Sequence, residues 1–131
     1  MSKRVLRVLM FNDSPAVLDT LTTWLEIHGH VARAVRLSEN RDGYDGTVEL
    51  IRSYGPDAIV FDVGLSYIAH WDFLDALRET PALKPFPFVV TTPNRAVLDK
   101  LIGKPTNAIE LVGREDDLTA ILAAVENAAT E

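Results

Sequence analysis

Asp13, Asp62 and the pair Thr91–Thr92 each stand at the end of a short apolar run of this 131-residue sequence. The carboxyl ends of parallel strands meet at one edge of a sheet, so the three runs could bring these polar side chains together. Two neighbouring carboxylates repel each other unless a cation neutralises them, and oxygen ligands with room for water suit Mg²⁺. An aspartate carboxylate can also attack phosphorus and form an acyl phosphate. These residue types therefore indicate Mg²⁺-assisted phosphoryl chemistry, with a threonine hydroxyl available to a phosphoryl oxygen.

The apolar runs alternate with segments of helical periodicity. Ser14-Pro15 is typical of a helix cap followed by proline in the first turn, and Gly29 stands where that helix would end. Residues 36–46 are polar and contain two glycines, which predicts a loop. The predicted strands are 5–11, 30–35, 58–61, 86–91 and 108–112, and the later helices are predicted at 47–54, around 71–77, at 95–102 and around 118–125.

Five strands that alternate with five helices predict an α/β fold with a parallel sheet covered on both faces. For five such units the usual solution is the doubly wound, flavodoxin-like strand order 2-1-3-4-5. In that order the first and third strands are neighbours, and strand order reverses between them. We therefore expect Asp13 and Asp62 to approach each other at the point where such sheets bind ligands.

The composition excludes several classes of protein. Thirteen Lys and Arg against nineteen Asp and Glu give a net charge of −6, which makes the chain a poor default binder of nucleic acids or anionic membranes. The absence of cysteine excludes disulfides, thiolate metal sites and cysteine nucleophiles. No apolar run is long enough to span a membrane, and 47% hydrophobic residues can form a core. We expect a single cytoplasmic domain over residues 1–131.

Three stretches carry a resemblance to a known family: RVLRVLMFNDSP at 4–15, PDAIVFDVGL at 56–65 and PFVVTT at 87–92. With them the chain resembles the receiver domain of two-component response regulators, over nearly its whole length. The resemblance implies a signalling domain rather than an enzyme. Its expected partners are a histidine kinase or phosphotransfer protein and a downstream protein target or a second copy of the chain.

The resemblance also implies roles for individual residues. Asp62 would be the phospho-accepting aspartate, and Asp13 one of the acidic pair that holds Mg²⁺. Gly64 would offer its backbone carbonyl to the metal, and Thr92 would be the hydroxyl residue of the switch. Phosphorylation would draw Thr92 inward and shift the face formed by the fourth helix, the fifth strand and the fifth helix.

Several positions depart from the family pattern. Asn12 replaces the first acid of the usual pair, so it could reach the metal only weakly, through a bound water. Ser66 replaces a proline, His70 stands where glycine is common, and Pro93 follows Thr92 where a small residue is usual. The replacement of an acid by Asn12 removes a negative charge from the metal site and is expected to weaken Mg²⁺ binding.

The family's lysine after the fifth strand has no clean match. Lys104-Pro105 has the right dipeptide but precedes that strand. Arg114 has a plausible spacing and could neutralise phosphate, although it lacks the proline and differs in geometry from lysine. The alternative interpretation of Arg114 is a solvated charge at the start of the last helix.

Two other functions remain open from the sequence. The departures at Asn12, Pro93 and the missing lysine favour a pseudo-receiver, a phosphorylation-independent interaction or dimerisation module. A flavodoxin-like enzyme or nucleotide binder is disfavoured because no glycine-rich phosphate loop follows the first strand. The alternative interpretation of the two aspartates is that Asp62 only caps a strand end and Asp13 only helps to cap the first helix.

Overall fold

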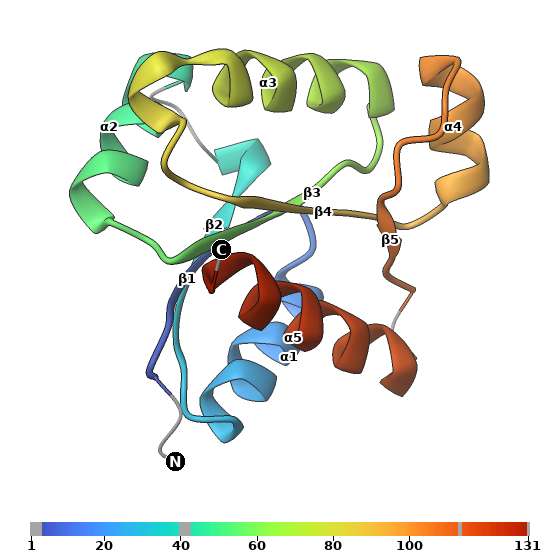
Figure 1. The fold of residues 1–131 in the computed structure, drawn as a ribbon. Helices are drawn as coiled ribbons and strands as arrows, with labels where there is room; N and C mark the ends of the chain where they lie inside the picture. Colours follow the sequence, from blue (N-terminus) through green and yellow to red (C-terminus); the bar gives the residue numbers. More distant parts are fainter. Residues whose placement is uncertain (1–3, 40–42, 113, 131) are drawn as a thin grey trace.

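The computed structural model describes residues 4–39, 43–112 and 114–130. Five strands and five α-helices alternate along the chain (Figure 1), with two short 3₁₀ helices between them. The elements are β1 (Arg7–Asn12), α1 (Pro15–Ile27), β2 (Val31–Arg36), η1 (Leu37–Glu39), α2 (Gly43–Tyr54), β3 (Ala58–Asp62), α3 (Tyr67–Glu79), η2 (Pro81–Leu83), β4 (Phe88–Thr92), α4 (Arg95–Ile102), β5 (Ile109–Glu110) and α5 (Glu115–Ala129).

The strands form one parallel sheet in the order β2-β1-β3-β4-β5. The predicted α/β class and strand order are confirmed. In the register of β1 with β3, Phe11 lies beside Phe61, so the residues that follow these strands lie at the same edge. In the register of β3 with β4, Asp62 lies beside Thr91.

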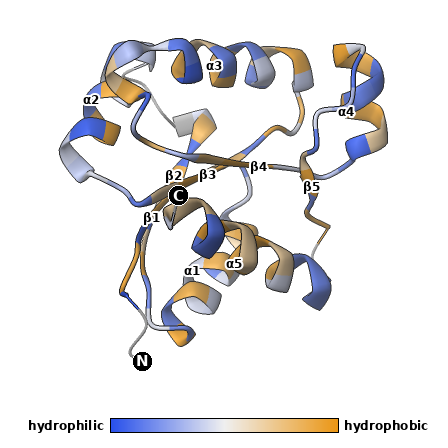
Figure 2. Ribbon diagram, in the orientation of Figure 1, coloured by the Kyte–Doolittle hydropathy of each residue, from blue (hydrophilic) through white to orange (hydrophobic). Residues whose placement is uncertain are grey.

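Alternation along the strands builds a separate core on each face of the sheet. Val8 and Met10 of β1 pack on the side covered by α1 and α5, whereas Leu9 and Phe11 pack on the side covered by α2, α3 and α4. The helices contain both apolar and polar residues, as their mixed colours in Figure 2 show, and apolar residues such as Leu21, Leu74 and Leu98 are buried. Burial on both faces fixes the strand register, because a slip of one residue would exchange the two cores.

The turn after β1 is set by local sequence. Ser14 caps α1, since its hydroxyl accepts the Val17 N–H at 3.2 Å, and Pro15 occupies the first helical position. The chain therefore leaves the sheet immediately after Asn12 and starts a helix, which places Asp13 at the sheet edge. At the end of α4, Gly103 adopts a left-handed φ of +86° that a residue with a Cβ would rarely take.

Two elements differ from the sequence prediction. The second helix begins at Gly43 rather than at Thr47, because Thr47 is buried and bonds back to the Gly43 carbonyl, and Asp45 suits the helix N-terminus. Strand β5 contains only Ile109–Glu110 of the predicted 108–112. It pairs with β4 alone, and the Val112 N–H leaves the ladder to bond the Asp117 carboxylate at 2.9 Å.

Within the described part of the chain, no helix is both long enough and apolar enough to cross a bilayer.

Candidate functional site

A pocket of about 310 Å³ lies at the carboxyl ends of β1 and β3, where strand order reverses. This is the position at which open α/β sheets bind ligands. The pocket brings together four residues that the sequence singled out: Asn12, Asp13, Asp62 and Gly64. Its full lining is Asn12, Asp13, Ser14, Val17, Asp62, Gly64, Leu65, His70, Pro93 and Leu111.

Asp62 is largely buried, and one of its carboxylate oxygens is already fixed. The Thr91 hydroxyl donates to Asp62 Oδ1 at 2.7 Å. Burial raises the pKa of the Asp62 carboxyl above its ordinary value, and the negative charge of Asp13 adds to the rise. The Thr91 hydrogen bond and the imidazole of His70 lower the pKa but do not outweigh burial. An ionised Asp62 is therefore costly unless a cation or further donors are present.

The hydroxyl beside Asp62 belongs to Thr91, whereas the sequence analysis assigned that role to Thr92. Thr92 is fully buried, and its hydroxyl donates to the Val63 carbonyl at 2.7 Å. Adjacent residues of a strand point to opposite faces, so only one of the two threonines can face Asp62. With Thr91 in that place, the residue that follows the hydroxyl is Thr92 rather than Pro93.

Asp13 is held through one carboxylate oxygen, and its other oxygen faces His70. Oδ1 accepts the Ser38 N–H at 2.6 Å, and Oδ2 lies 3.5 Å from Nε2 of His70. Asn12 is buried, and its side-chain oxygen accepts the Ser14 N–H at 2.9 Å. Asn12 therefore stabilises the turn that positions Asp13, and it adds no charge to the pocket.

Gly64 lies so close to Asp62 that the absence of a side chain matters. A Cβ at position 64 would lie 3.3 Å from Asp62 Oδ2 and 3.8 Å from Pro93 Cδ. The lack of a Cβ therefore lets the Gly64 backbone lie close to the Asp62 carboxylate. The Gly64 N–H donates to Nδ1 of His70 at 3.3 Å.

His70 is a site residue that the sequence analysis recorded only as a departure from the family pattern. It lies in the first turn of α3, directly after the loop that follows Asp62. The signal that could have revealed it is this spacing: the first turn of a helix that begins just after a strand end faces that strand end. Its imidazole lies between Asp13 and the Gly64 backbone.

Arg114 and Lys104, the two cations considered for the missing lysine, do not line the pocket. The Arg114 guanidinium lies 3.3 Å from Asp117 Oδ1 and 3.7 Å from Glu110 Oε1 at the start of α5, and it is largely exposed. The Asp117 carboxylate also accepts the Arg114 N–H at 3.1 Å, which caps the helix. The structure thus places Arg114 in a helix-capping cluster rather than beside Asp62.

The donor set of the pocket fits a hard cation. Two carboxylates, from Asp13 and Asp62, line it together with the Gly64 backbone. The described residues contain no group of three or more His, Cys, Asp or Glu arranged to hold a metal. Mg²⁺ is commonly held by one or two carboxylates and keeps several waters, so a pair of carboxylates suits Mg²⁺ better than metals that need a full protein cage.

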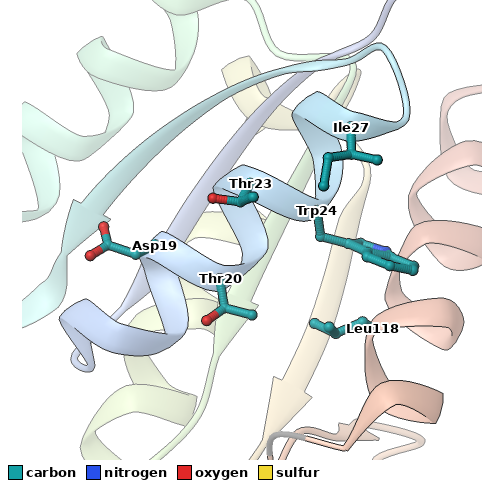
Figure 3. A pocket seen from close by; sticks show the side chains of 6 residues that line it. All are labelled: Asp19, Thr20, Thr23, Trp24, Ile27 and Leu118. Carbon is teal, nitrogen blue, oxygen red and sulfur yellow. The ribbon is translucent and has the colours of Figure 1, made fainter.

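A second hollow, of about 340 Å³, lies between α1 and α5. Figure 3 shows Trp24 of α1 reaching toward α5 close to Leu118. The only carboxylate in its lining is that of Asp19, and the remaining residues are threonine or apolar. Paired carboxylates are therefore found at the sheet edge and not in this hollow.

Comparisons with known proteins bear on the overall sequence and the fold. No protein-family model matches the chain. Protein PilH of Pseudomonas aeruginosa is 29% identical over 116 residues, which cover 88% of this chain and 91% of PilH.

Solved structures share the fold. The chemotaxis response regulator CheY4 of Vibrio cholerae is 18% identical with a TM-score of 0.64 and covers 93% of this chain and 99% of its own. A CheY-like response regulator receiver domain from Methylobacillus flagellatus is 21% identical with a TM-score of 0.66, over 93% and 99% of the two chains. A sensor protein from Polaromonas sp. JS666 is 17% identical with a TM-score of 0.71, over 95% and 96%.

Proposed function

We propose that this chain, which resembles response regulator receiver domains in sequence and fold, accepts a phosphoryl group on Asp62 from a histidine kinase or phosphotransfer protein. The observation that carries the proposal is the environment of the Asp62 carboxylate. It lies at the reversal point of the sheet, in the same pocket as Asp13, with a threonine hydroxyl on one oxygen. The phosphorylated form would then bind a downstream protein or a second copy of the chain.

The contacts of Asp62 indicate which oxygen reacts. Oδ1 accepts the Thr91 hydroxyl, so Oδ2, on the side of Gly64 and Pro93, is the nucleophile. The bond from Oδ2 to phosphorus forms as the bond from phosphorus to the donor's imidazole nitrogen breaks, and the electron pair of that bond returns to the imidazole. The product is an aspartyl phosphate, an acyl phosphate.

Asp13, Asp62 and the Gly64 carbonyl would hold Mg²⁺, with Asn12 contributing through water at most. Bound there, the cation supplies the charge neutralisation that phosphoryl transfer requires. Asp13 is kept in position for this by the Ser38 N–H. Because burial raises the pKa of Asp62, a positive charge nearby favours the ionised carboxylate that attacks.

A route from the site to the surface runs through β4 and β5. Thr91 pairs with Ile109 and Thr92 with Glu110, whose carboxylate accepts the Arg95 N–H at the start of α4 at 3.1 Å. A phosphoryl group on Asp62 offers the Thr91 hydroxyl a new acceptor, and a shift of β4 would move α4 with it. The exposed apolar side chains Val97, Leu101 and Val112 lie along these elements and could form the surface that responds.

The test is the intact mass of the protein after incubation with acetyl phosphate and Mg²⁺, quenched in acid. The proposal predicts a single phosphoryl adduct in the wild type that is absent with EDTA and absent in Asp62→Asn. An adduct of equal yield in Asp62→Asn would exclude Asp62 as the acceptor.

A pseudo-receiver is the second candidate, and one observation favours it. The site has one acid fewer than the family pattern, because Asn12 stands in its place, and the Asn12 side-chain oxygen accepts the Ser14 N–H. The Arg114 guanidinium is bound to Asp117 at the start of α5. In that case the domain would bind its partner equally well with Asp62→Ala, and Mg²⁺ would show no measurable affinity. Unchanged partner binding together with no phosphoryl adduct would select this candidate.

A further inference from the structure

We propose that His70 donates a hydrogen bond to the phosphoryl group on Asp62, in place of the lysine that the end of β5 does not provide. The inference rests on the proposed function and identifies one further residue that binds the transferred group. It concerns a side chain at the start of α3, a part of the chain that the sequence analysis did not connect with phosphate.

The hydrogen bonds of His70 fix the direction of its remaining N–H. The Gly64 backbone N–H can only donate, so Nδ1 of His70, 3.3 Å from it, must carry a lone pair. The ring proton is therefore on Nε2. This atom lies 3.5 Å from Asp13 Oδ2, and the side chain is 19% exposed, so the N–H is directed toward the acidic pocket.

The same pocket contains Asp62. His70 and Asp62 both line it. A phosphoryl group at Asp62 would extend into the space that His70 borders.

Few other donors are available there. Among the lining residues, only Asn12 and His70 have side-chain N–H groups, and the lining contains no lysine or arginine. Arg114 is engaged by Asp117 and Glu110. A phosphoryl group adds charge of about −1.5 to −2 and three strong acceptor oxygens, so the pocket needs donors beyond the Thr91 hydroxyl.

The contact of His70 with Asp13 is long enough to be exchanged. A charge-assisted N–H···O bond is typically about 2.7–2.9 Å, and the His70–Asp13 separation of 3.5 Å is well beyond that. A phosphoryl oxygen closer to Nε2 would be the better acceptor. The Gly64 N–H would continue to hold the ring in place during that exchange.

The test compares three variants in their binding of beryllofluoride, a phosphoryl mimic, in the presence of saturating Mg²⁺. His70→Leu removes both ring nitrogens. His70→Gln keeps one acceptor and one donor at similar separation. His28→Leu is the control, because His28 bonds the Trp24 carbonyl within α1 and does not line the pocket.

Loss of a hydrogen bond to a charged group corresponds to a fall in affinity of about tenfold or more, which is the effect expected for His70→Leu. His70→Gln is expected to remain within about threefold of the wild type, and His28→Leu to be unchanged. In a nitrogen-15 spectrum, the Nε2–H signal of His70 should shift on beryllofluoride binding. If His70→Leu does not fold, the His70→Gln variant and the Nε2–H signal still test whether His70 contacts the phosphoryl mimic.

Mg²⁺ affinity without beryllofluoride separates a direct contact from an effect through Asp13. A loss of beryllofluoride affinity in His70→Leu that is fully explained by weaker Mg²⁺ binding would overturn the proposal. Wild-type affinity for beryllofluoride in His70→Leu would also overturn it, while the assignment of Asp62 would survive. If the wild type binds neither beryllofluoride nor phosphate, the proposed function fails and the role of His70 fails with it.

Discussion

Among single residues, the chemistry of the pocket depends on which side chains meet at Asp62. Sequence spacing predicted that Asp13 and Asp62 lie at the same sheet edge, and the pocket contains both. It assigned the hydroxyl beside Asp62 to Thr92 rather than to Thr91, and an error of one residue along a strand exchanges its two faces. Only the register of β3 with β4, which pairs Asp62 with Thr91, makes the distinction.

The two threonines give a matched pair of variants. Thr91→Val removes the hydrogen bond that lowers the pKa of Asp62, so that pKa should rise further. Thr92→Val should leave the pKa of Asp62 unchanged and instead cost about 1–3 kcal/mol of stability, because the buried Val63 carbonyl loses its donor. A carbon-13 titration of the Asp62 carboxyl and denaturant unfolding measure the two effects. If Thr92→Val raised the pKa of Asp62 and Thr91→Val did not, Thr92 would be the residue whose hydroxyl bonds Asp62.

The raised pKa of Asp62 also predicts a pH dependence of stability. A carboxyl that holds its proton more tightly in the folded state stabilises the fold at low pH, and that contribution is lost as pH rises through the folded-state pKa. Asp62→Asn cannot ionise, so its free energy of unfolding should increase relative to the wild type as pH rises from below the ordinary value of 3.8 to neutrality. Asp19→Asn, at an exposed position of α1, is the control. A difference between Asp62→Asn and wild type that is constant with pH would contradict the burial argument.

At the scale of elements, most of the fold could be predicted. Apolar runs located all five strands, and caps located helix ends where the sequence has strong signals, such as Ser14-Pro15 before α1 and Gly103 after α4. The start of α2 was missed because Gly43 has low helix propensity, and burial of Thr47 outweighs that preference. The shortness of β5 depends on Asp117, a tertiary contact that no local pattern shows.

The start of α5 provides a prediction at this scale. Asp117 accepts the backbone N–H groups of Val112 and Arg114, so Asp117→Ala should cost about 1–2 kcal/mol of stability. Arg114→Ala removes only an exposed contact and should cost less than about 1 kcal/mol. Because Arg114 lies outside the pocket, its removal should also leave the yield of acetyl phosphate labelling unchanged. A large loss of labelling in Arg114→Ala would restore this residue as the substitute for lysine.

At the scale of the whole molecule, two cores hold a rigid sheet whose acidic edge lies in a chain of net charge −6. The sheet gives precise placement to Asp13 and Asp62, and the surrounding negative charge attracts cations to them. The fold class and the acidic pocket followed from the sequence. The contribution of His70 did not, because it arises from the packing of α3 over the end of β3.

Mg²⁺ should stabilise the whole domain. A ligand that binds only the folded state at about one hundred times its Kd adds about 2.7 kcal/mol to the free energy of unfolding. Thermal unfolding with increasing Mg²⁺ should show this rise in the wild type and a much smaller one in Asp13→Asn, which removes one of the two carboxylates. An equal rise in both proteins would place the cation elsewhere.

The most direct test of the central claim is to locate the phosphoryl group in the chain. Borohydride reduces an aspartyl phosphate to homoserine, so wild-type protein treated with acetyl phosphate and Mg²⁺, then reduced and digested, reports the modified position by mass. If Asp62 is the acceptor, homoserine will appear at position 62, in the peptide that contains the end of β3, and none will appear when Mg²⁺ is withheld. Homoserine at another aspartate, or an unmodified Asp62 in a folded sample, would contradict it.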